Sequence, residues 1–346
     1  MKKRGTLIAL WVAGVLMCAV IAAKLIESGR VQQAAPHEDS LFPLARPSNA
    51  RARVWKGEPK RIRSIPSSSS PFQLFRPRTI KLDARGDIYV VDSGDKLVKK
   101  FSREGELLLS IGKGQGSGPG EFLHPIDYDI DPQGNIWVCD ARTNLVSVFR
   151  ADGALARTIR VNALPYRITV SAPDLFVLML DRDELFGAFD STGRLLYTFG
   201  RFLREQAKFS MVLDGWIAGM SGATFVYAPL YRGMIVRLGY SGNIEMIRET
   251  IYSYPWPKMH ITPEGGTYVS NEAPYSSISL SCVDDTVFVL SRAGPQSKEE
   301  STLDAYDGGN GDYLFSTRLP QRVREAVVTR DCIFSLADTS ITIWQR

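Results

Sequence analysis

Short runs of alternating apolar and polar side chains, separated by turn sequences, fill residues 76–111. The run IKLD is followed by the turn ARGD, then by the β-branched and aromatic run IYVVD, by LVKKF, and by ELLLSI after a second turn. Runs of period two joined by glycine-containing turns are typical of β-hairpins. The pattern therefore predicts a unit of four antiparallel strands.

This unit is repeated. Residues 76–107 match residues 124–155 at a constant offset of 48 residues. The identical pairs include Pro77/Pro125, Asp83/Asp131, Gly86/Gly134, Asp92/Asp140, Phe101/Phe149 and Gly105/Gly153. A period near 48 has the size of one blade of a β-propeller. Weaker copies follow at offsets of 40 and 49 residues, and a last unit has only three strands before Arg346.

The strand missing from the last unit is predicted at the other end of the domain. Arg61–Ile65 resembles an outer strand, yet it precedes its own unit. Pairing with the C-terminal run SITIWQR would close the ring, and closure protects sheet edges. We therefore expect an all-β fold over residues 60–346, a six-bladed β-propeller of four-stranded antiparallel blades closed by an N-terminal strand.

The first two units, DARGDIYVVDSGDKLVKKFSREGE and DPQGNIWVCDARTNLVSVFRADGA, are joined by GSGPGEFLHP. They resemble the NHL repeats of six-bladed β-propellers; the likeness is looser in the third unit and only architectural in the last three. Members of that family include protein-binding and RNA-binding scaffolds, extracellular sensor domains and a peptidyl-amidoglycolate lyase. The resemblance implies a fold and does not select one of these functions.

The N-terminus has the pattern of a membrane segment. Lys2, Lys3 and Arg4 precede an uncharged run over residues 5–23, which is long enough to cross a bilayer as a helix. The basic residues before the run favour an N-terminus inside the cell. We expect an anchor over residues 1–24 that contacts the lipid bilayer, with a cleaved signal peptide as the alternative. Residues 25–59 then form a tether, and the propeller lies in the cell envelope on the extracytoplasmic side of the inner membrane.

The net charge of +5 belongs to the N-terminal part. Residues 1–65 hold 12 of the 42 basic and 4 of the 37 acidic residues, so the remainder has 30 basic and 33 acidic residues. A slightly acidic body lacks the basic surface of nucleic-acid-binding domains. No nucleic-acid partner is expected.

Charged residues recur in the first strand of successive units, which in a propeller lines the central channel. Lys81 is expected beside Asp129, and Asp127 beside Arg167, because an unpaired charge there would be costly. These residues either neutralise one another or form a polar site for a small ligand or peptide end. With two residues from the rim before each strand, the candidate binding residues are Arg76, Lys81, His124, Asp127, Asp129 and Arg167.

Nothing in the sequence predicts a catalytic residue, a metal site or a cofactor. A zinc site needs three or four converging ligands, and the three histidines are His37, His124 and His260, of which only His124 falls at the expected rim. The sequence favours a binding protein over an enzyme. The alternative is a metal-dependent lyase or hydrolase, similar to the amidoglycolate lyase or to a lactonase, with its site at the channel mouth.

The expected function is therefore recognition of a protein, peptide or glycan on one face of the ring. Two long segments, residues 252–275 and 292–301, support this interpretation because long loops in compact folds often carry recognition. Aromatic side chains such as Tyr252, Trp256 and Tyr275 would supply contact area. Cys282 and Cys332 fall in neighbouring units, and either a disulfide or buried thiols fit their positions.

Overall fold

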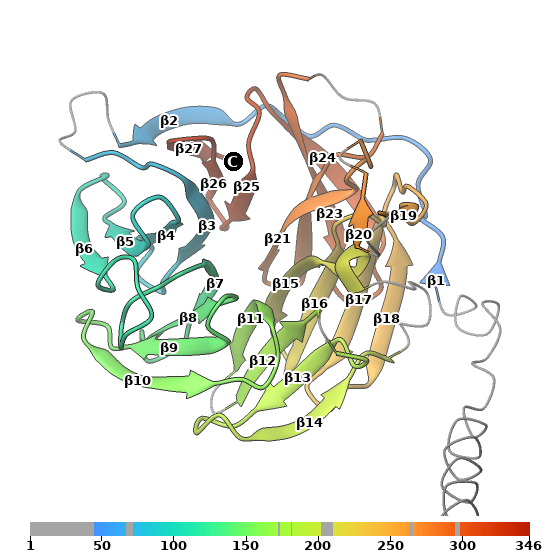
Figure 1. Cartoon of the computed structure of the whole chain (residues 1–346). Helices are drawn as coiled ribbons and strands as arrows, with labels where there is room; N and C mark the ends of the chain where they lie inside the picture. Colours follow the sequence, from blue (N-terminus) through green and yellow to red (C-terminus); the bar gives the residue numbers. More distant parts are fainter. Residues whose placement is uncertain are drawn as a thin grey trace, which may run out of the picture. The chain divides into compact units, whose positions relative to one another are not determined.

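The computed structural model describes residues 45–66, 72–171, 174–180, 182–201, 210–262, 266–270, 272–294 and 298–346. The predicted anchor over residues 1–24, including the expected transmembrane helix, and the first part of the predicted tether lie outside these ranges. Within the described ranges, no helix has the length and apolar character needed to cross a membrane. The described residues form seven β-sheets, and six of them are placed radially around a central channel (Figure 1).

Each of these six sheets is one blade, and in blades 1 to 5 the four repeat strands run from the channel outward in chain order. The first three blades follow the predicted repeat, with four antiparallel strands each. Blade 1 is β3 (Pro77–Leu82), β4 (Ile88–Asp92), β5 (Leu97–Phe101) and β6 (Leu107–Ile111). Blade 2 is β7 (Pro125–Ile130), β8 (Ile136–Asp140), β9 (Leu145–Phe149) and β10 (Leu155–Arg160). Blade 3 is β11 (Pro165–Ser171), β12 (Asp174–Met179), β13 (Phe186–Phe189) and β14 (Leu195–Phe199).

The last three blades keep the architecture although the sequence repeat has decayed. A short 3-10 helix, η3 (Ser210–Leu213), leads into blade 4. Blade 4 is β15 (Gly215–Met220), β16 (Thr224–Pro229), β17 (Met234–Gly239) and β18 (Ile244–Glu249). Blade 5 is β21 (Ser277–Val283), β22 (Thr286–Ser291), β23 (Ser301–Asp307) and β24 (Tyr313–Leu319). Blade 6 is β25 (Glu325–Val328), β26 (Cys332–Leu336), β27 (Ile341–Gln345) and, outermost, β2 (Lys60–Ile65).

The ring closes as the sequence predicts. β2 pairs antiparallel with β27, with Ser64 opposite Thr342 and Ile65 opposite Ile341. Blade 6 therefore combines one strand from the start of the domain with three strands from its end, and Figure 1 shows β2 beside β27. The described core is divided in the same way, into six apolar clusters that each lie between neighbouring blades. One of them joins blade 6 to blade 1 through side chains such as Phe334 and Ile80.

In blades 1 and 2, the repeated aspartates hold the inner strand to its own blade. Asp92 accepts hydrogen bonds from the main-chain N–H groups of Phe75, Arg76 and Gly94. Asp140 does the same in blade 2 for the N–H groups of Leu123 and His124. These carboxylates cap the turns around the strand entries, which is the common role of aspartate in such positions.

The structure differs from the predicted tether over residues 45–59, which pack against the propeller. β1 (Ala45–Arg46) adds to blade 4 as a fifth strand, parallel to β18. Further along, Trp55 forms an isolated bridge to Ser316 of β24, supported by main-chain hydrogen bonds of 2.8 Å from Ser316 to Val54 and from Lys56 to Ser316. We call residues 45–59 the strap, because they connect the outer edges of blades 4 and 5 to β2 of blade 6.

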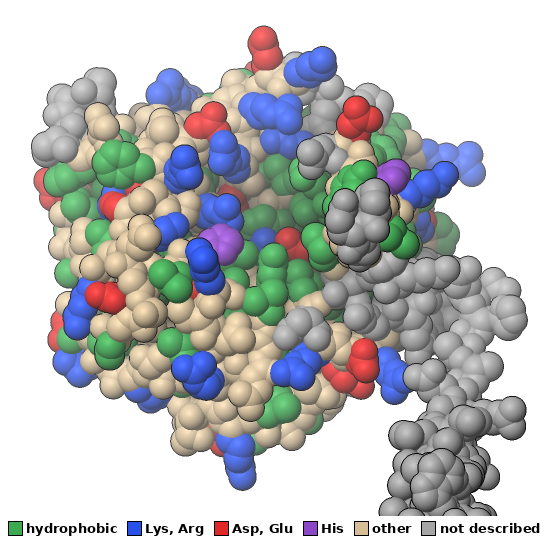
Figure 2. All heavy atoms as spheres, viewed as in Figure 1, with side chains coloured by type: hydrophobic (Ala, Val, Ile, Leu, Met, Phe, Trp, Pro, Cys, Tyr) green, Lys and Arg blue, Asp and Glu red, His purple; other side chains and the backbone are tan. Residues whose placement is uncertain are grey.

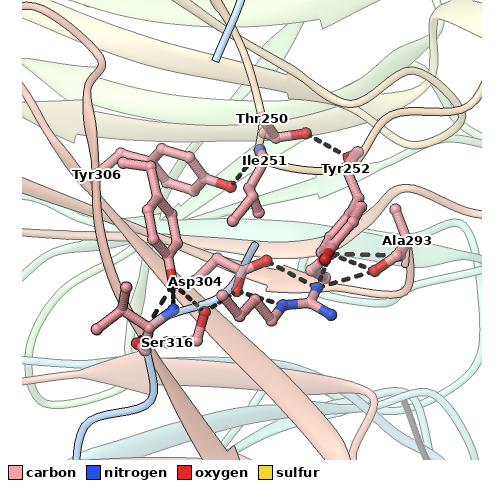
Figure 3. Close-up of polar contacts among 11 residues, drawn as sticks. Thr250, Ile251, Tyr252, Ala293, Asp304, Tyr306 and Ser316 are labelled. Atoms are coloured by element: carbon pink, nitrogen blue, oxygen red, sulfur yellow. Dashed lines mark hydrogen bonds and ion pairs between the residues drawn. The ribbon is translucent and has the colours of Figure 1, made fainter. Parts of the chain in front are cut away.

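A buried ion pair fixes the strap. The Arg53 side chain, 3% exposed, binds the fully buried Asp304 through two nitrogen–oxygen contacts of 2.9 and 3.0 Å. It also donates to the carbonyl of Ala293 at 2.8 Å and lies over the ring of Tyr252, while Ser316 donates to Asp304 (Figure 3). No local pattern in the chain indicates this contact, because Arg53 and Asp304 are 251 positions apart.

The long segment before blade 5 folds into a small hairpin of its own. β19 (Met259–Ile261) pairs antiparallel with β20 (Thr267–Val269). Met259, Val269 and Trp256 pack against the cluster between blades 3 and 4, whereas Tyr268 and Tyr275 are 48% and 45% exposed. The segment therefore covers part of the core and also presents aromatic side chains to solvent.

Candidate binding site at the channel mouth

The six inner strands β3, β7, β11, β15, β21 and β25 surround a channel cavity of about 380 Å³. An inner strand has no neighbour on its channel side, so its N–H groups there need other partners. Asp127 accepts from the N–H of Ile168, and Ser279 accepts from the N–H of Ala326, in each case on the next blade. Polar residues in the channel thus have a structural task, which is to cap the inner edge of the following blade.

Lys81 and Asp129 meet as the sequence predicts, with 3.0 Å between Nζ and Oδ1. Asp129 also accepts hydrogen bonds from Thr169 Oγ1 and from the N–H of Val170. The charges of Asp129 and Asp127 outweigh the burial that would lower the pKa of Lys81, and the net pKa of the lysine is raised. Lys81 is therefore a cation in the channel wall, and its charge is matched by Asp129.

Arg167 is found with a different partner from the predicted one. Its guanidinium lies 3.6 Å from Asp214, in the loop between η3 and β15, and stacks 4.4 Å over the ring of Trp216. Arg167 is 9% exposed, and its Nε has no hydrogen-bond partner among the described residues. Asp127 contributes to the electrostatic environment of Arg167 without forming the expected close contact. The guanidinium of Arg167 is thus stacked against the channel wall, and its Nε–H group has no acceptor among the described residues.

Glu325, at the start of β25, is a channel residue with a strongly perturbed pKa. It is 5% exposed, its Oε1 accepts a hydrogen bond from the N–H of Ile80, and its buried Oε2 has no partner within the described structure. Burial and the neighbouring Asp127 raise the pKa of Glu325 to about 8. Burial also raises the pKa of Asp127. The channel therefore holds two buried carboxyl groups, Asp127 and Glu325, whose ionised forms are disfavoured.

All inner strands begin on one face of the ring, which we call the strand-start face. Figure 2 shows this face, with Lys and Arg side chains gathered around the central hollow over blades 6, 1 and 2. Arg78 at the start of β3 is exposed, and it interacts electrostatically with Arg167 and with Arg324, which precedes β25. Burial and these two cations lower the pKa of Arg78. Three guanidinium groups, from the starts of the inner strands of blades 1, 3 and 6, thus lie at the channel mouth.

The other candidate residues lie on the same face. His124, before β7, is partly buried, and burial together with Arg78 and Lys96 lowers its pKa, which favours the neutral ring. Arg76 is exposed before β3, and its side chain has no hydrogen-bond partner in the described part of the chain. The structure therefore places three of the candidate residues in the channel wall, namely Lys81, Asp127 and Asp129, and the other three, Arg76, His124 and Arg167, at its entrance.

Five residues of this region were missed by the sequence prediction: Arg78, Asp214, Trp216, Arg324 and Glu325. Four of them belong to blades 4 and 6, where the repeat no longer identifies the channel positions. Glu325 could have been found from its place before the apolar run AVV, which matches the start of an inner strand. Arg78 was missed because its position alternates along β3 with those of the predicted channel residues. By this alternation alone, its side chain is predicted to face solvent.

No group of three or more His, Cys, Asp or Glu side chains within the described ranges has the spacing to hold a metal ion. Cys139, Cys282 and Cys332 are free thiols, so the disulfide considered for Cys282 and Cys332 is not formed. Cys282 lines the channel, and burial raises its pKa to about 12. A thiol with a raised pKa is a poor nucleophile at neutral pH.

Comparison with protein families identifies the architecture. The family model DUF5128, described as a 6-bladed beta-propeller, matches residues 69–198, which span blades 1 to 3. The match confirms the predicted six-bladed propeller, although it covers less than half of the chain. The NHL family is not confirmed by it. A search of curated proteins gives no match.

Solved structures show the same fold over most of the chain. One is a protein of Bacteroides fragilis NCTC 9343 assigned as exported, with 13% identity over 88% of this chain and 99% of that chain and a TM-score of 0.55. A duf4221 family member from Bacteroides vulgatus has 10% identity over 83% and 97%, with a TM-score of 0.52. Virginiamycin B lyase from Staphylococcus aureus has 9% identity over 82% and 98%, with a TM-score of 0.51. At these identities the likeness shows the fold alone.

Proposed function

We propose that this protein is an extracytoplasmic, membrane-tethered binding propeller that recognises a protein, peptide or glycan partner on the strand-start face. One observation carries the proposal. Charged groups from blades 1, 3, 4 and 6 converge at the channel mouth on the same face as the exposed aromatic side chains of the segment before blade 5. A concave polar centre with aromatic residues beside it is the usual composition of a recognition surface.

The aromatic part of this surface is ordered by its contacts. Tyr275 is 45% exposed, and its ring packs against Tyr231 with 5.4 Å between the centroids. Tyr231 itself packs on the apolar cluster between blades 3 and 4. A tyrosine held by a neighbour loses little conformational entropy when a partner binds, which makes it a good anchor residue.

The membrane location rests on the sequence. The uncharged run over residues 5–23, preceded by three basic residues, supports an anchor with the propeller translocated. A reporter enzyme that folds only outside the cytoplasm, fused after Arg346, should be active in the full-length chain. It should lose activity when residues 1–24 are deleted, and activity without them would contradict the tethered location.

Site-specific photo-crosslinking tests the binding surface in the full-length chain. A photoreactive residue replaces Tyr275 on the strand-start face, and the control variant carries it at Arg85, in the turn at the opposite end of β3. Both positions are exposed. We expect a discrete cross-linked product in membranes from position 275 and none from position 85. Products from neither position, or equal products from both, would reject this face as the recognition surface.

A further inference from the structure

The charges at the channel mouth do not balance. Arg167 has Asp214 as its partner at 3.6 Å, and Arg324 has Asp338 at 2.6 Å. Deeper in the channel, Lys81 has Asp129. Arg78 has no hydrogen-bond or ion-pair partner in the described part of the chain, and the cations that act on its pKa are Arg167 and Arg324. Among the described residues, one positive charge at the entrance therefore has no counter-charge.

Repulsion between guanidinium groups is tolerated here because the fold fixes them on separate blades. Arg78 lies on β3, Arg167 on β11 and Arg324 before β25, and each strand is held by its own sheet. Such an arrangement costs free energy unless an anion lies between the cations. A second observation comes from Arg167, which is 9% exposed and whose Nε has no acceptor among the described residues, so this N–H group can donate to a bound anion.

We propose that the channel mouth binds the carboxylate group of a small organic acid or of a peptide C-terminus, between Arg78, Arg167 and Arg324. This inference rests on the proposed function and names the ligand chemistry of the same face. Guanidinium groups match carboxylates because two parallel N–H donors meet two oxygens. The three arginines do not line the channel cavity themselves. It is lined by Trp216, on which Arg167 stacks, and by Glu325, the residue after Arg324, and its volume of about 380 Å³ is that of a small-molecule site.

The surroundings favour a carboxylate over a phosphate. A single cation is uncompensated, which matches a single negative charge. Asp214 lies beside Arg167, and it would repel a dianion more strongly than a monoanion. Inside the channel, the partner-free Oε2 of Glu325 belongs to a carboxyl group that is held largely protonated, so it presents a hydrogen-bonding group to the body of the ligand.

Calorimetric titration of the purified full-length chain tests the inference, with four probes at constant ionic strength. The probes are butyrate, tetra-alanine with a free C-terminus, tetra-alanine amide and inorganic phosphate. We expect saturable binding of butyrate, of the free peptide or of both, and none of the amide. Binding of butyrate alone identifies a small acid as the source of the carboxylate, whereas binding of the free peptide alone identifies a chain end.

The matched variants lie at the two ends of one strand. Arg78→Gln removes the unpaired cation and should weaken carboxylate binding about tenfold, because a charge-assisted hydrogen-bond pair is lost. Arg85→Gln removes an equally exposed arginine from the opposite face and should change the affinity less than twofold. Both side chains are exposed, so neither variant endangers folding.

Four results would overturn the inference: no saturable binding of any carboxylate probe, tighter binding of phosphate than of butyrate and the free peptide, equal binding of the amide, or equal effects of the two variants. These failures are separable from failure of the proposed function. A cross-link from position 275 without carboxylate binding would leave the recognition face in place and remove only the ligand assignment. Carboxylate binding without a cross-link from position 275 would keep the ligand assignment and remove the recognition face.

Discussion

Glu325 makes the channel sensitive to pH. Its pKa is about 8 in the folded protein, against an ordinary value of 4.5, because burial and Asp127 disfavour its charged form. Between these two values the folded state keeps a proton that the unfolded state releases. The stability contribution of this group is therefore fully present below pH 4.5 and is lost as the pH rises through 8.

We expect Glu325→Gln to flatten the pH dependence of stability. The wild-type free energy of unfolding should fall between pH 5 and pH 9, by a term on the order of 5 kcal/mol for a full shift of this size. The amide cannot ionise, so the variant should be more stable than the wild type at pH 9. Thermal midpoints across this range measure the effect, and Glu104→Gln, at an exposed position, is the control. Parallel curves for Glu325→Gln and the wild type would show that Glu325 is already ionised at neutral pH.

At the scale of elements, the strap shows where sequence patterns stop being informative. The blades could be predicted because each repeats the same alternation and the same turn residues, and every copy supports the others. The strap occurs once and has no periodicity. Its anchor, Arg53, depends on Asp304 in β23, far along the chain, and neither residue has a local signal. The same limit explains why Asp214 and Glu325 were missed, since both contribute to the channel from blades without a recognisable repeat.

The strap gives a prediction about stability. Arg53→Ala leaves the fully buried carboxylate of Asp304 without its cation, and we expect a loss of about 3–5 kcal/mol in the free energy of unfolding. Arg51→Ala, two residues away at an exposed position, should change it by about 0.5 kcal/mol or less. Urea unfolding of the full-length chain measures both variants.

A double variant separates charge from packing. If the unpaired carboxylate dominates the loss, Arg53→Ala combined with Asp304→Ala should be more stable than Arg53→Ala alone, because the isolated buried charge is gone. Additive losses would mean that the two side chains stabilise the strap independently. A loss near 0.5 kcal/mol for Arg53→Ala would mean that the strap contributes little to the stability of the ring.

For the whole molecule, the important property is that no blade has a core of its own. Each apolar cluster is shared by two neighbouring blades, and the cluster between blades 6 and 1 contains residues from both ends of the domain. Opening the ring at any seam therefore exposes two apolar sheet faces. The channel mouth depends on this closure as well, since Arg78 and Arg324 lie on blades 1 and 6.

A covalent link across the closure tests this dependence. The hydroxyl oxygens of Ser64 and Thr342 lie 3.2 Å apart on β2 and β27, so cysteines at both positions have the proximity that a disulfide needs. The oxidised Ser64→Cys, Thr342→Cys variant should be more stable than its reduced form by about 2–4 kcal/mol, because the link restricts the unfolded chain. Thermal unfolding with and without reductant measures this difference, and non-reducing peptide mapping verifies the 64–342 cross-link. A verified cross-link that leaves the midpoint unchanged would mean that unfolding starts at another seam of the ring, and closure by β2 would then not limit the stability of the channel mouth.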